Sequence, residues 1–420
     1  MLKSRLMIAT AVVVLLCAMG VASGEEYTIT HLSTSAHSES WQEFLYEMAE
    51  LFEEAYPQYK VDIQIGAYEK FLVMIAGGVS PDVLDLPTHG AGSAVADGLF
   101  LDLRPYLNRE RRLADKFPKP MLDALTAPDG TLFMLPIEAY SIVTWYNLDM
   151  LNAAGLTPPA ELGQKWNWDT MREYGRKLTK RSADGNVQVW GLDRVRSRPY
   201  IQTVQAGGNF FDRDIFPTKS MILSDPVITG VEFIEKLIWE DGTTQPHGKG
   251  GALYTGQAAI DTVDGPGILG TRMRNVGFEW DVAPQPYGPD NNATNVSLNG
   301  FEISAHSANK DAAWEWVKFI GTTEDAHRRF VKHTGRLSVF REVALRWNTL
   351  MPVDLPKNWS VFFEQSVHPK NVYLKEGIVQ DDRIMTILQQ QLVRIWNGET
   401  STRIALEEAD RLIRPLLAGN

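Results

Sequence analysis

Segments with the two-residue apolar period of strands alternate along the chain with segments that have the helical period. Residues 27–33 and 59–66 show the every-second-residue alternation of half-buried strands, whereas residues 38–56 between them carry apolar side chains at helical spacing. A strand, a helix and a strand in this order predict a βαβ unit. The alternation continues and predicts an α/β fold. Further strands are expected within 81–88, 129–136, 135–151, 257–265 and 297–305, and helices within 166–180, 225–242 and 309–322.

The length of the chain exceeds what one hydrophobic core normally supports. With 420 residues, two domains of ordinary size are expected. The sequence has no Pro- or Ser-rich linker and no low-complexity tract. Two domains without a linker must share segments that cross between them.

The first residues are typical of a secretory signal peptide. Two basic residues precede a long apolar run, which ends in small residues up to Gly24. We expect residues 1–24 to be removed, so that the mature chain begins at Glu25 in the periplasm or at the extracellular cell surface. A lipid anchor at Cys17 is the alternative, although Leu16 before it is bulkier than lipoprotein processing generally accepts.

Cysteine content and charge exclude several classes of function. Cys17 is the only cysteine, so the mature chain has no disulfide, thiolate metal ligand or thiol nucleophile. The formal net charge of −11 repels nucleic acid and anionic lipid. Zinc-protease, phosphate-loop and esterase motifs are missing from the sequence, and residues 290–295 depart from a calcium loop. We expect no nucleic-acid partner, no metal and no cofactor.

Residues 135–151 place a carboxylate, Glu138, inside a run that otherwise suits a buried strand. Glu is rarely buried without a partner, so a polar group is expected to meet it. A structural ion pair and a ligand contact both satisfy that expectation. Tyr140 is correspondingly either plain packing or part of a binding site.

Seven motifs in this order and spacing resemble the family 1 extracellular solute-binding proteins of ABC importers, the group that includes the maltose-binding protein. The resemblance covers nearly the whole mature chain, although each motif alone is short. The motifs are SPDVLDL at 80–86, GLFLDLRPYL at 98–107, DGTLFMLPIEAYSIVTWYNLDMLNAAGLTPP at 129–159, AGGNFFD at 206–212, GQAAIDTVDGPG at 256–267, WDVAPQPYGP at 280–289 and KDAAWEWVKFIGTTEDAHRRFVKHTGRL at 310–337.

The resemblance implies an α/β fold of the two-lobe periplasmic-binding-protein type (type II), with lobes joined by a hinge of crossing segments. The expected lobes are 25–138 with 282–320, and 139–281 with 321–420. The implied function is capture of a carbohydrate in the cleft between the lobes and its delivery to the membrane permease of an ABC importer. A monomer without catalytic activity is expected.

A sugar site needs flat apolar faces for ring C–H groups and fixed donors and acceptors for hydroxyls. Trp41 and Tyr200 are expected as stacking surfaces, and Glu138 and Asp264 as acceptors. Helix capping by Ser38 or Ser40 is the alternative for the loop after the first strand. A surface position is the alternative for His89, which follows the third strand. The full set expected at the cleft is Trp41, His37, His89, Glu138, Tyr140, Tyr200, Asp264, Gly265, Asn299 and Gly300.

Some features leave the ligand open. Gly267 stands where the family often has an aromatic residue after Gly-Pro, and Ser338 where its signature has proline, so the ligand need not be the usual maltodextrin. Arg194, Arg196 and Arg198 lie two apart and share one face if extended. They form either a solvated edge strand or a clamp for an acidic ligand. The alternatives are a binding protein for a sugar acid, glycerol phosphate or peptide-like solute, and a secreted glycoside hydrolase.

The turn after the predicted strand 257–265 contains the G-x-G-x-x-G spacing of a dinucleotide site, with Gly265, Gly267 and Gly270. Pro266 removes a backbone N–H that a phosphate loop would supply, and the motif lies far from the first βαβ unit. The resemblance implies a better interpretation, in which Asp264 and the turn after it present a carboxylate and a helix start to the ligand. Helix capping by Asp264 or Gly265 is the alternative, and one residue can do both.

Overall fold

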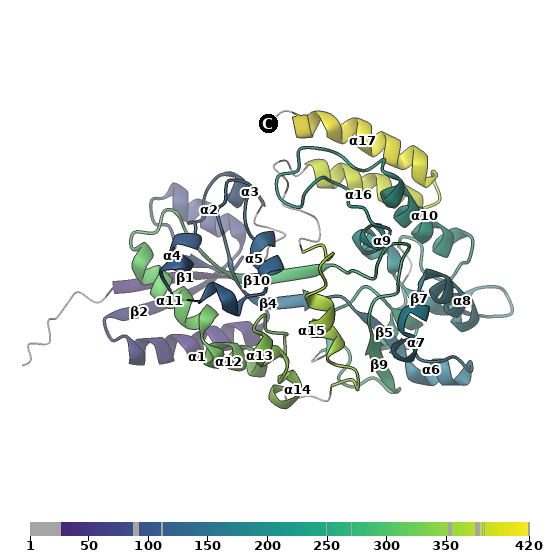
Figure 1. Cartoon of the computed structure of the whole chain (residues 1–420), viewed down its shortest axis with the longest axis horizontal. Coiled ribbons are helices and arrows are strands. Elements are labelled where there is room, and N and C mark those ends of the chain that lie inside the picture. The colour runs from purple at the N-terminus through teal and green to yellow at the C-terminus, as the bar shows by residue number, and fades with distance from the viewer. Residues whose placement is uncertain are drawn as a thin grey trace, which may run out of the picture.

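A computed structural model describes residues 27–86, 92–110, 112–248, 250–269, 271–351, 355–373, 379, 381 and 383–418. The chain forms two parts, each built around a five-stranded sheet (Figure 1). The expected signal peptide and Cys17 lie outside the described residues. A search of the described helices finds none with the length and apolar character that a membrane span requires.

The first sheet has the strand order β2-β1-β3-β10-β4. β1 pairs in parallel with β2 and β3, and β10 is antiparallel to β3 and β4. The βαβ unit predicted from the first residues is therefore confirmed. The strands are β1 (Tyr27–Thr34), β2 (Tyr59–Gly66), β3 (Val83–Leu84), β4 (Leu135–Ser141) and β10 (Val296–Ile303).

The second sheet has the order β6-β7-β8-β5-β9. Its central strands β7 and β8 are parallel, whereas β5 is antiparallel to both of its neighbours. The strands are β5 (Thr144–Asn147), β6 (Lys180–Arg181), β7 (Val187–Asp193), β8 (Ala258–Asp261) and β9 (Trp280–Ala283).

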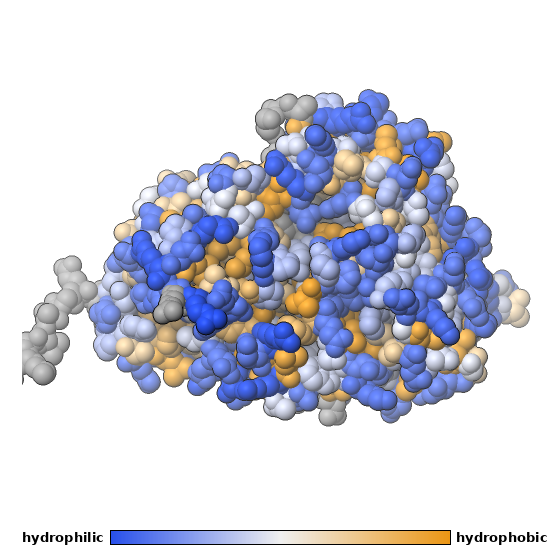
Figure 2. All heavy atoms as spheres, in the orientation of Figure 1, coloured by the Kyte–Doolittle hydropathy of each residue, from blue (hydrophilic) through white to orange (hydrophobic). Residues whose placement is uncertain are grey.

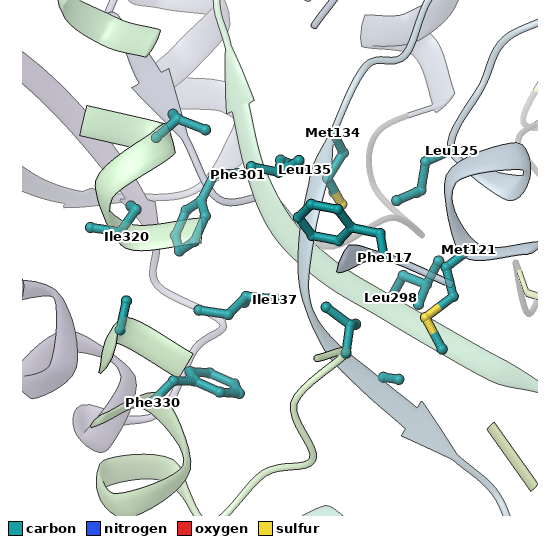
Figure 3. Packing of buried hydrophobic residues seen from close by; sticks show 14 of the residues in the cluster. Phe117, Met121, Leu125, Met134, Leu135, Ile137, Leu298, Phe301, Ile320 and Phe330 are labelled. Carbon is teal, nitrogen blue, oxygen red and sulfur yellow. The ribbon is translucent and has the colours of Figure 1, made fainter. Parts of the chain in front are cut away.

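Helices cover the first sheet because their apolar stripes face it. In α1 the buried Trp41, Phe44, Met48 and Phe52 recur at helical spacing. Figure 3 shows Phe301, Ile320 and Phe330 among the buried side chains of this core, with Ile137 between Phe301 and Phe330. The helices of this part are α1 (Glu39–Ala55), α2 (Tyr68–Ala76), α3 (Gly92–Ala96), α4 (Arg104–Arg109), α5 (Lys119–Ala124), α11 (Lys310–Thr322), α12 (Glu324–Thr334), α13 (Arg341–Ala344), α14 (Trp347–Leu350) and α15 (Val361–Ser366).

A second cluster of buried side chains joins the second sheet to its own helices. These are α6 (Leu148–Ala153), α7 (Pro159–Leu162), α8 (Trp168–Leu178), α9 (Pro199–Gln205), α10 (Asp225–Trp239), α16 (Arg383–Trp396) and α17 (Thr402–Ala418). Short 3₁₀ helices complete the fold: η2 (Ala114–Lys116), η3 (Gly163–Lys165), η4 (Val195–Ser197), η5 (Leu253–Thr255) and η6 (Pro266–Ile268).

The chain passes between the two parts three times, and the passages lie side by side. The first joins β4 to β5, the second joins β9 to β10, and the third follows α15. Ile142 N donates to Asn295 O (3.2 Å), Val296 N to Val372 O (2.8 Å), and Val372 N to Thr294 O (3.0 Å). These backbone bonds tie the three crossing segments into one connection.

The packing of α12 to α15 differs from the predicted division of the chain at residue 321. Phe330 of α12 lies edge-on to Trp41 (5.4 Å between ring centroids) and to Phe44 (5.5 Å), and Val343 and Trp347 are buried in the same cluster. Their apolar faces meet α1 and the first sheet. Helical spacing in the sequence shows that a face is apolar but does not show which element covers it.

Most predicted elements are present, several of them with shorter bounds. The run 135–151 breaks into β4, β5 and α6, because Ile142 and Val143 belong to the first crossing segment. The strand expected within 81–88 is reduced to β3, and 129–136 forms regular strand only from Leu135 onward. Trp314 and Trp316 of α11 are core residues.

Candidate functional site

A cleft of ≈ 480 Å³ lies where the first sheet approaches the turn that follows β8 of the second. Two larger hollows, of ≈ 700 and ≈ 690 Å³, contain no residue of β4 or β10. The face in Figure 2 is largely hydrophilic, with apolar side chains scattered over both parts. The cleft is lined by Ala36, His37, Glu138, Tyr140, Asp264, Gly267, Ile268, Thr271, Arg272, Asn299 and Arg336.

Glu138 stands at the wall that the first sheet provides. Its Oε2 accepts hydrogen bonds from Asn299 Nδ2 (2.7 Å) and Arg336 Nη1 (3.1 Å). Its Oε1 has no hydrogen-bond partner within the described residues. The predicted polar partner of Glu138 is therefore Arg336, together with Asn299. The other carboxylate oxygen is buried without a hydrogen-bond partner among the described residues.

A bulge places Asn299 opposite Glu138. The register of β10 against β4 shifts between Asn299 and Gly300. A Cβ on Gly300 would lie 2.1 Å from Leu135 O, so only glycine allows the two strands to approach this closely. Gly300 thus shapes the wall without lining it.

Tyr140 spans from the first sheet to the turn after β8. Its hydroxyl accepts a hydrogen bond from Gly265 N (3.2 Å). A Cβ on Gly265 would lie 2.5 Å from Tyr140 Cε1, and one on Gly267 2.8 Å from Cε2. Burial, with a smaller contribution from Asp264, raises the pKa of Tyr140 to about 12. The ring therefore occupies the space that a side chain at position 267 would need, and its hydroxyl keeps its proton at neutral pH.

Asp264 stands at the second wall, in an ion network. Arg194 Nη2 donates to Asp264 Oδ2 (2.9 Å) and to Asp261 Oδ2 (3.3 Å), and Arg194 Nε donates to Asp193 Oδ1 (2.6 Å). Burial raises the pKa of Asp261 well above its usual range, and the charges of Asp264 and Asp193 act in the same direction. One guanidinium thus pairs with three carboxylates of the second lobe.

Trp41 and His37 form the back of the first wall. Their rings stack with centroids 3.8 Å apart and an interplanar angle of 18°. Trp41 is fully buried, and its Nε1 donates to Asp85 Oδ2 (2.7 Å). His37 Nε2 lies 3.1 Å from Asp85 O. His37 lines the cleft, whereas Trp41 supports it from behind in this arrangement.

Comparison with known proteins agrees with this architecture. The profile of the bacterial extracellular solute-binding proteins matches residues 35–327. The chain belongs to this family. An uncharacterised lipoprotein of Streptomyces antibioticus is 25% identical over 352 residues, covering 76% of this chain and 73% of the relative. The maltotriose-binding protein of Pyrococcus abyssi is 26% identical over 289 residues, covering 64% of this chain and 57% of the relative.

Solved structures show the same fold. An ABC substrate-binding protein of Listeria monocytogenes, solved in complex with cycloalternan, matches with a TM-score of 0.77 and 23% sequence identity. The match covers 94% of this chain and 100% of the other. The two parts of the chain are therefore the two lobes of an extracytoplasmic solute-binding protein, joined by the crossing segments.

Several predicted residues of this solute-binding protein lie elsewhere. Tyr200 of α9 is 6% exposed, packs edge-on to Phe210 (5.2 Å) in the second core, and does not line the cleft. His89 and Gly270 lie outside the described residues. Gly265 acts through its backbone on Tyr140 rather than through a surface of its own. The cleft thus brings together His37, Glu138, Tyr140, Asp264 and Asn299.

The three arginines at 194, 196 and 198 are neither a solvated edge nor a free clamp. Arg196 Nε donates to Gln245 O (3.1 Å), and Arg198 Nε donates to Val263 O (2.6 Å). A short 3₁₀ helix, η4, replaces the extended segment that would have put them on one face. All three guanidiniums bond protein groups of the second lobe.

Sequence reasoning missed the two cleft cations. Arg336 follows Gly335, whose φ of 67° ends α12, and reaches Glu138 across 198 positions of sequence. Arg272 lies in the turn after β8, with its guanidinium carbon 5.1 Å from the Tyr254 ring centroid. The sequence signal was only local: Arg336 follows a glycine within the quoted motif 310–337, and Arg272 follows the quoted motif 256–267. Within the described residues no group of three or more His, Cys, Asp or Glu is placed to hold a metal.

Proposed function

We propose that this solute-binding protein captures a carbohydrate in the cleft and delivers it to an ABC importer. The observation that carries the proposal is the composition of the two walls. Glu138, Asn299 and Arg336 on the first lobe face Asp264 and Arg272 on the second. Fixed acceptors and donors on both sides match the hydroxyls of a sugar, and a volume of ≈ 480 Å³ lies within the range of about 300–1,000 Å³ of small-molecule sites.

The aromatic contact in this proposal comes from Tyr140. A side chain at Gly267 is excluded by the Tyr140 ring, so the ring replaces the aromatic residue that relatives often carry after Gly-Pro. Relatives named for maltotriose and galactooligosaccharide binding support a carbohydrate ligand. The departure at Gly267 supports a ligand other than a standard maltodextrin.

One observation favours a sugar acid as a second candidate. The guanidinium of Arg272 forms no ion pair within the described residues and stands over Tyr254 at the edge of the cleft. A carboxylate or phosphate on the ligand would pair with it. Such binding weakens as salt rises, whereas hydrogen bonding to neutral hydroxyls depends little on ionic strength.

The test is a thermal-shift screen, followed by calorimetry, with neutral mono- and oligosaccharides, sugar acids, sugar phosphates and short peptides. Ligand at about one hundred times its Kd adds roughly 2.7 kcal/mol of apparent stability. We expect a shift with neutral carbohydrate, and a salt-dependent shift with a sugar acid if the second candidate is right. A shift with peptides alone would reject both.

We infer further that the protein acts as a monomeric carrier and not as an enzyme. Chromatography of an oligosaccharide after prolonged incubation is expected to return it unchanged, whereas a glycoside hydrolase would shorten it. Mass spectrometry of the exported protein is expected to give a chain that begins at Glu25. A lipidated Cys17 would instead mean that the protein is attached to the membrane by a lipid anchor.

We also propose lobe boundaries that follow the packing. The first lobe comprises residues 27 to about 141 and about 296 to 366. The second comprises about 144 to 292 and about 373 to 418. Limited proteolysis in the crossing segments, with and without ligand, tests this division.

A further inference from the structure

A hairpin that leaves the second lobe reaches the first. We call residues 209–222 the arm. Phe211 and Ser220 pair across it in antiparallel fashion. Its base belongs to the second lobe, because Ile222 is buried in the second cluster and Ser220 Oγ donates to Asp410 Oδ1 of α17 (2.6 Å). The arm therefore moves with the second lobe.

The tip of the arm packs on the first lobe. Ile215 is 6% exposed and belongs to the first hydrophobic cluster, which also includes second-lobe side chains such as Leu253 and Ile268. Phe216 packs against the same cluster. Phe216 also lines a cavity of ≈ 390 Å³, whose other walls come from the first lobe and include Val95, Phe100 and Phe133. This contact lies outside the cleft. Next to it, Asp214 of the arm accepts a hydrogen bond from the backbone of Tyr373 in the third crossing segment.

Bonds within the arm hold the tip in an uncommon conformation. Phe216 has a φ of 47°, in the left-handed region that residues other than glycine rarely adopt. Arg213 Nε donates to Phe216 O (2.7 Å), and Asp212 accepts from Thr218 N (2.9 Å) and Thr218 Oγ1 (2.8 Å). Such a conformation persists only where the surroundings fix it. Hydrogen bonds within the arm thus fix the backbone conformation of its tip at Phe216.

We propose that the arm is a latch between the lobes: Ile215 and Phe216 dock on the first lobe when the lobes are together and leave it when they separate. Separation about the crossing segments carries the arm away with α17 and exposes both side chains to water, which is unfavourable. Docking therefore raises the closed fraction of the ligand-free protein. The apparent Kd equals the intrinsic Kd divided by the fraction of molecules that are competent to bind. Ile215 and Phe216 therefore affect ligand affinity by positioning the lobes, without touching the ligand.

The test measures the distance between the lobes without ligand. Spin labels at Glu69→Cys on α2 and Glu407→Cys on α17, both at exposed positions, report it in a chain beginning at Glu25, which has no other cysteine. In I215S/F216S we expect the short-distance population to fall at least about threefold and the apparent ligand affinity to fall by a similar factor. Met221→Ser, at an exposed position of the same arm, is expected to match the wild type.

Phe216→Leu keeps an apolar tip and is expected to restore most of the short-distance population. Identical distance distributions in I215S/F216S and the wild type would overturn the latch. Circular dichroism confirms folding, and if the double variant does not fold, Phe216→Ser alone decides in the same way. Because the distance measurement uses no ligand, its result can reject the latch without rejecting the proposed carbohydrate ligand. A failure to bind carbohydrate would likewise leave the latch untouched.

Discussion

The two lobes bury acidic groups next to the cleft in different ways. In the first lobe Asp85 and Glu302 are fully buried. Asp85 accepts from Ser33 Oγ, Thr34 N and Trp41 Nε1 (2.7, 2.6 and 2.7 Å), and the neighbouring His31 is neutral because burial lowers its pKa to about 3. In the second lobe Arg194 balances three carboxylates.

The difference has a consequence for each wall. Burial raises the pKa of Asp85 to about 7 and that of Glu302 well above its usual range, so protons neutralise the first cluster. A permanent cation neutralises part of the second. The buried acids behind Trp41 and His37 are neutralised by protons alone, whereas the wall around Asp264 combines the cation of Arg194 with Asp261, whose pKa is also raised by burial.

The largest expected effect is on the second cluster. Arg194→Met leaves Asp193, Asp261 and Asp264 without their cation, and breaking a buried ion pair from one side costs about 3–5 kcal/mol. We expect a loss of that size in the free energy of unfolding, measured by urea denaturation. Arg403→Met, at an exposed position of the same lobe, is expected to change stability by less than about 0.5 kcal/mol. Equal stabilities of the two variants would contradict the network.

The next effect is the pH dependence of stability that Glu302 of the first cluster causes. Between its ordinary pKa and its raised folded pKa, Glu302 holds a proton in the native state but not in the unfolded state, so native stability falls as pH rises. In the wild type, Leu86 N donates a hydrogen bond to Glu302 Oε2 (3.1 Å). Glu302→Gln keeps an oxygen acceptor for Leu86 N but removes the titrating carboxyl group. The stability of the variant relative to the wild type is expected to rise by up to about 1.4 kcal/mol per pH unit above about pH 4.5.

Other buried groups titrate in the same range, which is why the variant is compared with the wild type rather than studied alone. His31 and His327 are both buried with pKa values lowered to about 3, so they destabilise the fold as pH falls below about 6.5. Their contribution is the same in both proteins and cancels in the difference. Parallel stability curves from pH 4 to pH 7 would show that Glu302 is ionised in the native state.

A smaller effect concerns binding at the first wall. Glu138→Gln keeps one acceptor for Asn299 and Arg336 but removes the charge and the free Oε1. A hydrogen bond to a charged group contributes about 1.5–3 kcal/mol, so calorimetry with the identified carbohydrate is expected to show a roughly 10- to 100-fold weaker Kd. Glu364→Gln, exposed on α15, serves as the control. Wild-type affinity in Glu138→Gln would remove this carboxylate from the site.

The sequence predicted the fold class, and several of the residues it singled out line the cleft. Strand and helix periods reveal local elements, and the quoted motifs led to the two-lobe architecture. Glu138 and Tyr140 could be predicted because a carboxylate and an aromatic interrupt an apolar strand. Arg336 could not, because its partner lies 198 positions away and no local pattern marks the pairing.

Trp41 shows the opposite error. Its position next to a polar loop suggested a surface that opens onto the cleft. The helical recurrence of Trp41, Phe44, Leu45, Met48 and Phe52 was the stronger signal, and it indicates a buried stripe. The division at residue 321 fails to match the packing for a related reason, since α12 covers α1 from a distant part of the chain.

The central claim is that the lobes close on a carbohydrate between the two walls, because contacts split between lobes favour only the closed state. Small-angle scattering of the wild type and of I215S/F216S, each with and without saturating ligand, tests it most directly. We predict a smaller radius of gyration with ligand in both proteins, with the larger decrease in the latch variant. Scattering curves unchanged by ligand in both proteins would contradict the claim.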